Sequence, residues 1–243
     1  MKRQQIKYTQ NFITAKEDIE GILSLTNISQ NDLLYEIGSG KGHFTKELCK
    51  ICKEVTAIEI DTKMCEATRK RVGNQNNLNI INENVLSYNF PHDKDYKIYG
   101  NIPYNISTDL VKKIAYETSA SDSFLIVEEG FAKRLLDMNR ALALILRKDL
   151  EISIVKNIPR TIFHPRPSVD SSLIRMKRLN NYMTSRDRQI YEDFVYSWVN
   201  KDYRKLFTKN QIRRVKQNVK INDFSQVTLE QFDSIFESYQ LFN

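Results

Sequence analysis

Short apolar runs alternate with helical patterns between residues 33 and 128, and this alternation limits the fold more than any other feature of the chain. The predicted strands are residues 33–37, 54–60, 78–81, 96–99 and 123–128. Apolar residues at helical spacing predict helices over 14–26, with Thr14 as N-cap, 43–50, 62–72 and 107–117. Strands that alternate with helices favour an open α/β sheet with mainly parallel strands and right-handed crossovers.

The pattern changes after about residue 178. Residues 179–243 carry apolar side chains at helical spacing and contain no glycine, and the segment 163–176 just before them holds two of the five prolines. We therefore expect a Rossmann-like α/β domain over 1–178 and a small all-helical domain over 179–243.

The chain shows no sequence sign of a membrane segment, a secretory signal or a metal site. Apolar stretches such as 141–146 are far too short to span a bilayer, and residues 1–12 lack the apolar core of a signal peptide. Cys49, Cys52 and Cys65 are too few for a disulfide framework, and no second pair of ligands follows Cys49 and Cys52. We expect a cytoplasmic protein without a bound metal, and a monomer.

Positive charge is concentrated in two blocks of the chain, whose formal net charge is +7. Residues 131–180 hold eleven Lys and Arg against four acidic residues, and residues 201–220 hold eight against the single Asp202. Tyr203 and Phe207 are interleaved in the second block. A charged run is often only a solvated face, but two such blocks favour a polyanionic partner, nucleic acid first of all.

The sequence YEIGSGKGHF, residues 35–44, places three glycines directly after the first predicted strand. Glycine lets the backbone turn sharply and approach a ligand, and open α/β sheets bind ligands at this edge. A P-loop is excluded because Gly42 and His43, not Ser or Thr, follow Lys41. The dinucleotide pattern fits poorly because its third glycine would come one residue later. A plain glycine turn without a ligand remains a third interpretation.

Polar residues also follow the next predicted strands. Glu59 comes nineteen residues after Gly40, where an acidic side chain can accept both hydroxyls of a ribose. In the loop NENVL, residues 82–86, a polar side chain and the next backbone N–H can read an adenine edge. With Asn-Ile-Pro-Tyr at 101–104, the set indicates a cofactor with an adenosine and a zwitterionic tail. S-adenosylmethionine fits this description better than NAD.

Residues 101–104 also suit methyl transfer to an exocyclic amine. The lone pair of such an amine is delocalised into the purine ring, and two acceptors on its N–H bonds would localise and aim it. The Asn101 side-chain oxygen and the Ile102 carbonyl can supply them, with Pro103 fixing the backbone. Tyr104 offers a face on which a flipped base can stack, worth about 1–3 kcal/mol. A strand end followed by a proline turn is the plain structural alternative.

These motifs make the chain similar, along essentially its full length, to the erythromycin-resistance (Erm) family of ribosomal RNA adenine-N6 methyltransferases. The blocks that carry the resemblance are IKYTQNFIT (6–14), YEIGSGKGHFT (35–45), AIEID (57–61), GNIPYNIST (100–108), VEEGFAKRLL (127–136), FHPRPSVDSSLIR (163–175) and LFTKNQ (206–211). The resemblance implies S-adenosylmethionine as methyl donor. The implied substrate is one adenine in the peptidyl-transferase loop of 23S rRNA before ribosome assembly is complete, mono- or dimethylated at N6. The implied outcome is resistance to macrolides, lincosamides and streptogramin B.

The resemblance also assigns roles to single residues. Asn11 and Ile13 would line the methionine end of the cofactor, and Ile60 its adenine. The full cofactor-binding set is Asn11, Ile13, Gly38, Gly40, Glu59, Ile60, Asn84, Val85 and Asn101. The catalytic set is Asn101, Ile102, Pro103, Tyr104 and Phe163, the last stacking on the other face of the base. Phosphate contacts are expected at Lys133, Arg134, Arg140 and Arg166, each of which could equally be a solvated charge.

One residue departs from the family, since Asn84 stands where Asp is usual. An amide oxygen can accept the cofactor's adenine amine, but without the help of a charge, which predicts somewhat weaker cofactor binding.

Other functions remain open. The 16S rRNA adenine dimethyltransferase of ribosome assembly shares the fold and an Asn-Leu-Pro-Tyr motif, but the block 206–211 and the compact C-terminal unit favour Erm. A DNA adenine methyltransferase more often has Asp-Pro-Pro-Tyr. A non-catalytic RNA-binding or transcription accessory protein would keep the fold as a platform. The basic run around Arg213, Arg214 and Lys216 suggests that the C-terminal helices clamp RNA.

Overall fold

The computed structural model describes residues 11–180 and 183–242, so that residues 6–10 of the first resemblance block lie outside the described chain. The described residues form two compact units. The first takes those up to Leu136 and Asp149–Leu179, and the second takes Asp137–Lys148 and those from Asn180 onward. The second unit thus includes residues 137–148, which the sequence analysis assigned to the first domain.

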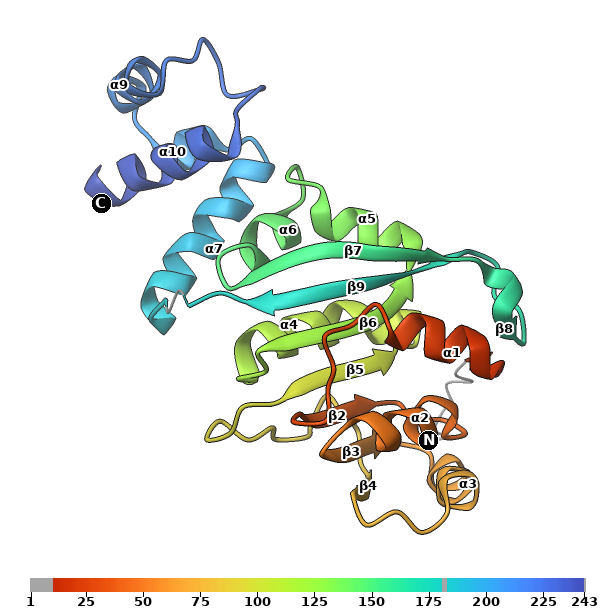
Figure 1. Cartoon of the computed structure of the whole chain (residues 1–243). Helices are drawn as coiled ribbons and strands as arrows, with labels where there is room; N and C mark the ends of the chain where they lie inside the picture. Colours follow the sequence, from red (N-terminus) through yellow and green to blue (C-terminus); the bar gives the residue numbers. More distant parts are fainter. Residues whose placement is uncertain (1–10, 181–182, 243) are drawn as a thin grey trace, which may run out of the picture. The chain divides into compact units, whose positions relative to one another are not determined.

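A seven-stranded sheet with the order β4-β3-β2-β5-β6-β9-β7 is the centre of the first unit (Figure 1). Five neighbouring strands are parallel: β4 (Leu78–Asn82), β3 (Glu54–Glu59), β2 (Leu33–Ile37), β5 (Lys97–Asn101) and β6 (Asp122–Glu128). These are the five strands that the apolar runs predict, with ends that differ by one or two residues. The predicted α/β class with a parallel-rich sheet is confirmed.

The strand order reverses direction next to β2. From β2 the chain moves outward through β3 to β4, and then returns to place β5 on the other side of β2. Ile37 at the end of β2 is therefore paired with Gly100 near the end of β5. In open α/β sheets, the crevice at such a reversal is the usual place for a ligand.

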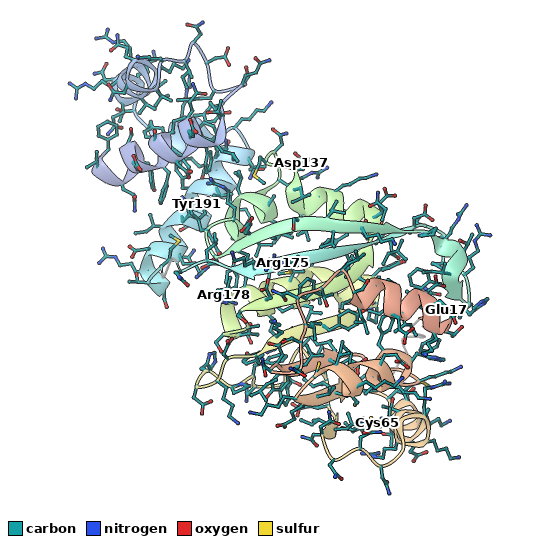
Figure 2. All side chains as sticks on the ribbon, in the orientation of Figure 1. Glu17, Cys65, Asp137, Arg175, Arg178 and Tyr191 are labelled. Carbon is teal, nitrogen blue, oxygen red and sulfur yellow. The ribbon has the colours of Figure 1, made fainter. Side chains whose placement is uncertain are left out.

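Two antiparallel strands that the sequence analysis missed extend the sheet beyond β6. β9 (Ser171–Arg178) pairs with β6, and β7 (Leu150–Ile158) pairs with β9. Arg175 of β9 forms an ion pair of 2.6 Å with Asp122 of β6, and Arg178 donates to the carbonyl of Ile114 (Figure 2). β7 alternates apolar and polar side chains only from Leu150 to Ile154, and the pattern breaks where its register shifts between Ile154 and Lys156.

A second, two-stranded sheet joins the start of the described chain to a segment far along it. β1 (Phe12–Ile13) runs antiparallel to β8 (Phe163–His164), with Ile13 opposite Phe163. This ribbon brings the first resemblance block next to FHPRP, although about 150 residues separate them.

Helices α1 (Lys16–Leu23), α2 (His43–Ile51) and α3 (Thr62–Val72) contribute to one buried cluster with alternate residues of the strands. Its members include Ile22, Leu34, Leu48, Val55, Val72, Tyr99, Phe124 and Ile126. Helix α4 (Ser107–Glu117) follows β5, and α5 (Glu129–Leu136) packs against β6, β7 and β9. The predicted cap of α1 is wrong, because the N-cap is Ala15 and makes no side-chain hydrogen bond.

The second unit is helical, as predicted for the C-terminal residues. Its helices are α6 (Ala141–Leu146), α7 (Ser185–Val199), α8 (Tyr203–Leu206), α9 (Lys209–Val219) and α10 (Leu229–Phe242). An aromatic core joins α7 to α10 through Tyr191, Phe194, Trp198, Phe232 and Phe236. The Tyr191 hydroxyl (Figure 2) donates to the Leu144 carbonyl at 2.8 Å, which ties α6 to α7. In the described parts of the chain, every helix is too short or too polar to cross a bilayer.

Candidate active site

A cavity of about 640 Å³ lies at the carboxyl ends of β2, β3 and β5, where the strand order reverses. Its lining includes most residues that the sequence analysis singled out: Asn11, Gly38, Gly40, Glu59, Ile60, Asn84, Val85, Asn101, Ile102, Pro103, Tyr104 and Phe163. Ile13 is buried beside it at 1% exposure and is not part of the lining.

The glycine turn after β2 forms one side of the cavity. Gly38 and Gly40 both adopt left-handed backbone conformations, with φ of 72° and 55°. A Cβ on Gly40 would come within 2.6 Å of the Phe12 ring. Phe12 therefore packs directly over the turn, with Lys41 Nζ 5.0 Å from its ring centre. The close approach of this ring requires glycine at position 40.

The Glu59 carboxylate is held by backbone amides. It is 5% exposed, Oε2 accepts from the Gly40 N–H and Oε1 accepts from the Asp61 N–H, both at 2.9 Å. Each oxygen keeps a second lone pair. The carboxylate is thus fixed in orientation and can still accept the two hydroxyls of a ribose, which is the role predicted for it.

A second carboxyl, Glu36, lies buried next to the same turn. It belongs to β2 opposite Tyr99 of β5. Glu36 Oε2 and the Tyr99 hydroxyl are both buried, and neither has a hydrogen-bond partner within the described part of the chain. Burial, with a smaller contribution from the charge of Glu59, raises the pKa of Glu36 to about 7. Burial also raises the pKa of Tyr99. Two buried polar groups, Glu36 and Tyr99, thus lie beside the glycine turn, and the sequence did not predict them.

Asn84 lines the cavity from the turn that follows β4. Its Oδ1 accepts from the Leu86 N–H at 3.0 Å, which closes the turn after β4. The Nδ2 group is the other branch of the same amide and is a donor only. The oxygen keeps a second lone pair, so the acceptor role expected of Asn84 stays a prediction.

Asn101 is oriented from the N-terminal segment. Its Nδ2 donates a hydrogen bond of 3.0 Å to the main-chain carbonyl of Asn11. Because a carbonyl can only accept, the amide oxygen of Asn101 is the branch that remains free. Among residues 11–180 and 183–242, the buried side-chain oxygen of Asn11 has no hydrogen-bond partner, and Asn11 lines the cavity. A donor on the ligand, such as an ammonium group, would satisfy it.

The Ile102 peptide is anchored from both sides. Its N–H donates to the Ile126 carbonyl of β6 at 3.0 Å, and its side chain is 2% exposed. A Cβ on Gly100 would lie 2.5 Å from Ile102 Cδ1 and 2.9 Å from the Ile37 carbonyl. Gly100 is thus needed for Ile102 to pack, and Pro103 follows with φ of −56°. These contacts fix the backbone that carries the second predicted acceptor.

Two aromatic side chains reach the cavity in different ways. The Tyr104 hydroxyl hydrogen-bonds to Ser171 Oγ at 3.0 Å, which holds its ring from the start of β9. Phe163 is 2% exposed and also belongs to the hydrophobic core of the first unit. Tyr104 is half-buried and can offer a stacking face, whereas Phe163 meets the cavity as part of its floor.

The four predicted phosphate contacts lie outside the cavity. Lys133 pairs with Glu129 at 2.7 Å, Arg134 lies 3.9 Å from Glu128, and Arg140 lies 3.4 Å from Asp137. Arg140 belongs to the second unit. Arg166 is exposed on the segment after β8. Their contact with RNA stays a prediction.

The sequence analysis missed several wall residues, including Phe12, Asp61, Glu83, Leu86 and Asn105. Phe12 is placed there by its pairing with β8, which no local pattern reveals. Asp61 could have been found, because it caps α3 by accepting from the Lys63 N–H at 2.8 Å, a typical N-cap pattern. In the described chain, His, Cys, Asp and Glu form no group of three able to hold a metal ion.

The donors and acceptors of this cavity fit S-adenosylmethionine. The Asn11 oxygen suits an ammonium group, the Glu59 carboxylate suits a ribose, and the half-exposed Ile60 suits a flat ring. Beyond these, Asn101 and Tyr104 leave an acceptor and an aromatic face for a second, planar guest.

Comparisons with known proteins agree with this geometry. Residues 1–243 match the family described as ribosomal RNA adenine dimethylase. A protein of Lysinibacillus sphaericus named rRNA adenine N-6-methyltransferase is 52% identical over 243 residues, 100% of both chains. A protein of the same name from Staphylococcus aureus (strain Mu50) is 50% identical, again over 100% of both chains.

Two solved structures share the fold. The crystal structure of the 23S rRNA methyltransferase ErmE matches with a TM-score of 0.79 and 20% identity, and covers 94% of this chain and 99% of that one. A dimethyladenosine transferase from Plasmodium falciparum matches with a TM-score of 0.70 and 22% identity, and covers 95% and 96%. At these identities they bear on the fold alone, and they confirm the predicted fold class.

Proposed function

Because this chain belongs to the ribosomal RNA adenine dimethylase family, its reaction is methyl transfer to N6 of an rRNA adenine, and we propose that its substrate is 23S rRNA. The proposed target is one adenine of the peptidyl-transferase loop, dimethylated with S-adenosylmethionine as donor. The proposed consequence is resistance to macrolides, lincosamides and streptogramin B. The enzyme would act as a monomer on RNA that is not yet fully assembled into ribosomes.

The hydrogen bond from Asn101 to the Asn11 carbonyl is the observation that carries the chemistry. It turns the Asn101 oxygen toward an incoming amine, as an acceptor that aims the N6 lone pair needs. The Ile102 carbonyl, whose peptide is anchored to β6, supplies the second acceptor. A monomethylated amine keeps one N–H, so either acceptor can still hold it for a second transfer.

The remaining residues bind and align. Glu59 and the glycine turn position the donor, while Tyr104 stacks on the extruded base. When bound, S-adenosylmethionine supplies an electrophilic methyl group whose thioether leaving group drives the transfer. No side chain has to act as a strong base, since the methylated amine can release its proton to water. Alignment is therefore the main contribution of the protein.

The choice of 23S over 16S rRNA rests on the sequence blocks. LFTKNQ at 206–211 and the compact C-terminal unit resemble the Erm family, and the two relatives above have the same length as this chain. Their printed name does not specify which rRNA is methylated. The 16S rRNA of ribosome assembly is therefore the alternative substrate that the experiment must include.

Transfer of labelled methyl groups to protein-free 23S and 16S rRNA tests the proposal. We expect label in 23S rRNA at a single adenine, found as N6-dimethyladenosine by mass spectrometry and lost in Asn101→Ala. Expression of the gene in a sensitive bacterium should raise the inhibitory concentration of erythromycin. Label in 16S rRNA alone would assign the protein to ribosome assembly. Binding of RNA without any transfer would indicate the accessory protein.

A further inference from the structure

The second unit has a cavity of its own, of about 640 Å³, at the end of α7. We call it the C-terminal cleft. Its lining comes from the α7–α8 connection, helix α9 and the loop before α10: Lys201, Asp202, Tyr203, Arg204, Ile212, Lys216, Asp223, Phe224 and Ser225. All residues that line the cleft belong to the second unit, and none of them lines the cavity described above.

Aromatic rings form a rigid wall of the cleft. Tyr203 and Phe224 have ring centres 4.8 Å apart, and each lies 5.2 Å from the Trp198 ring. Phe224 and Trp198 are buried, whereas Tyr203 is half-buried and lines the opening. Bases of single-stranded nucleic acid stack on aromatic rings that are held in place in this way.

The acidic residues of the cleft are already engaged. Asp202 pairs with Lys205 at 2.9 Å, and Asp223 accepts from the Ser225 N–H at 2.7 Å. Lys216 is also occupied, since it donates to the Asn222 carbonyl at 2.9 Å and lies over the Phe224 ring. Lys216 thus supports the wall, and the contact with RNA that the basic run suggested for it stays a prediction.

Two cations at the opening of the cleft form no ion pair within the described residues. Lys201 and Arg204 are exposed, and among residues 11–180 and 183–242 neither has an ion-pair partner. Arg213 and Arg214 of α9 are exposed as well. An anion entering the cleft therefore meets free positive charge beside an aromatic face.

The backbone of Lys201 adopts an unusual conformation, which Lys220 after α9 shares with φ of 58°. The φ of Lys201 is 60°, a left-handed conformation that glycine adopts freely and other residues adopt at a cost. It follows the last turn of α7, and its N–H donates to the Trp198 carbonyl at 2.9 Å. Glycine is the usual residue at this position after a helix. A lysine at this position is strained, and its side chain lines the cleft.

We propose that the C-terminal cleft binds one single-stranded nucleotide of the rRNA substrate, at a distance from the target adenine. The base stacks on Tyr203, and the phosphate lies between Lys201 and Arg204. The cleft would hold the RNA in register, and the catalytic cavity would act on one adenine of it. This proposal rests on the proposed function, because it takes the ligand to be the same rRNA.

The test compares three variants with wild type in binding a 23S rRNA fragment that contains the peptidyl-transferase loop and its flanking strands. Affinity is measured between 50 and 200 mM KCl. Lys201→Gln/Arg204→Gln should bind about tenfold more weakly at the highest salt, and its log–log salt slope should fall by roughly 0.7 for each lost phosphate contact. Tyr203→Leu should lose about tenfold at an unchanged slope. Lys201→Gly should raise Tm by about 2–4 °C yet lower RNA affinity.

The control variant is Arg186→Gln/Lys177→Gln, which removes two exposed cations that line neither cavity. Equal affinities and slopes for this control and Lys201→Gln/Arg204→Gln would overturn the cleft proposal, even if the wild type methylates 23S rRNA. A wild type that methylates no rRNA would overturn the proposed function instead. Binding of poly-glutamate but not RNA, lost in Lys201→Gln/Arg204→Gln, would assign the cleft to an acidic protein and reject the proposal.

Discussion

The side-chain amide of Asn101 donates a hydrogen bond of 3.0 Å to the main-chain carbonyl of Asn11, across 90 residues of sequence. One bond thus leaves the oxygen of the Asn101 amide free for the acceptor role proposed for it. The donor comes from the end of β5, and the acceptor immediately precedes β1. Orientation of this proposed acceptor therefore depends on the N-terminal segment staying paired with β8.

Substitution of Asn101 by Asp should show that orientation matters as much as the presence of an oxygen. A carboxylate keeps an acceptor but cannot donate to the Asn11 carbonyl, and the two oxygens repel each other. We expect Asn101→Asp to lower kcat by roughly 100-fold, similar to Asn101→Ala. Single-turnover methylation of the rRNA fragment measures this. Near wild-type turnover in Asn101→Asp would mean that the hydrogen bond to Asn11 has no catalytic role.

Substitution of Asn84 by Asp should tighten cofactor binding. The Asn84 oxygen already accepts from the Leu86 N–H, so only its second lone pair, without the help of a charge, is left for the adenine amine. In Asn84→Asp, one carboxylate oxygen can keep the turn and the other can accept from the amine. We expect about tenfold tighter binding of S-adenosylhomocysteine by calorimetry.

The matched ligand for this test is S-inosylhomocysteine, which carries an oxygen in place of that amine. It should bind wild type better than it binds Asn84→Asp, because an amide donor suits the oxygen and a carboxylate does not. If both ligands respond to the substitution in the same direction, Asn84 does not read this edge of the base.

Substitution of Gly40 by Ala should be more harmful with Phe12 present than without it. The added Cβ would lie 2.6 Å from the Phe12 ring, and φ is positive at this position. In a Phe12→Ala background only the backbone strain of about 1 kcal/mol should remain. Urea unfolding of the four proteins of this cycle measures the coupling.

Gly42→Ala is the control for that cycle. Its Cβ would meet the Thr68 backbone at 2.9 Å, a contact that removal of Phe12 cannot relieve. The cost of Gly42→Ala should therefore be the same in both backgrounds. A Gly40→Ala cost that is equally insensitive to Phe12 would show that the ring does not pack over the turn in solution.

Substitution of Glu36 by Gln should change how stability depends on pH. The pKa of Glu36 is about 7 in the folded protein, against an ordinary value of 4.5. Between these values the folded state holds a proton that the unfolded state has lost, so folding is increasingly disfavoured as pH rises through this window. Above pH 7 the ionised carboxyl destabilises the fold by on the order of 3 kcal/mol.

Free energies of unfolding at pH 5 and pH 8 for wild type and Glu36→Gln check this prediction. Other titrating groups cancel in the difference between the two proteins. That difference should move by about 3 kcal/mol in favour of Glu36→Gln between the two pH values. A difference that stays constant would place the Glu36 carboxyl in contact with water.

Local patterns were sufficient to predict the parallel half of the fold. β2, β3 and β6 are mostly apolar and mostly buried, as expected where both faces of a sheet are covered, and each ends at or just before a glycine or a polar residue. Gly38, Glu59 and Asn101 could be placed at one edge because parallel strands share their carboxyl ends. Their functional roles stay predictions, although one cavity brings them together.

Long-range pairing explains most of what the sequence analysis missed. β7 is irregular and β9 is antiparallel, so neither fits the βαβ pattern. Phe12 reaches the cavity only because His164 is its partner in β8. The hydrogen bond of Asn84, in contrast, is local. An Asx-type bond from the Leu86 N–H could have been predicted from the loop sequence.

The β1–β8 ribbon also determines when the site can form during synthesis of the chain. Phe12 leaves the ribosome early, but its partner strand is translated about 150 residues later. Until then, residues 11–13 of the growing chain have no strand to pair with. Phe12 is then not fixed over the glycine turn, and Asn11 is not fixed beside Asn101. The nascent protein cannot complete its active site before His164 has emerged.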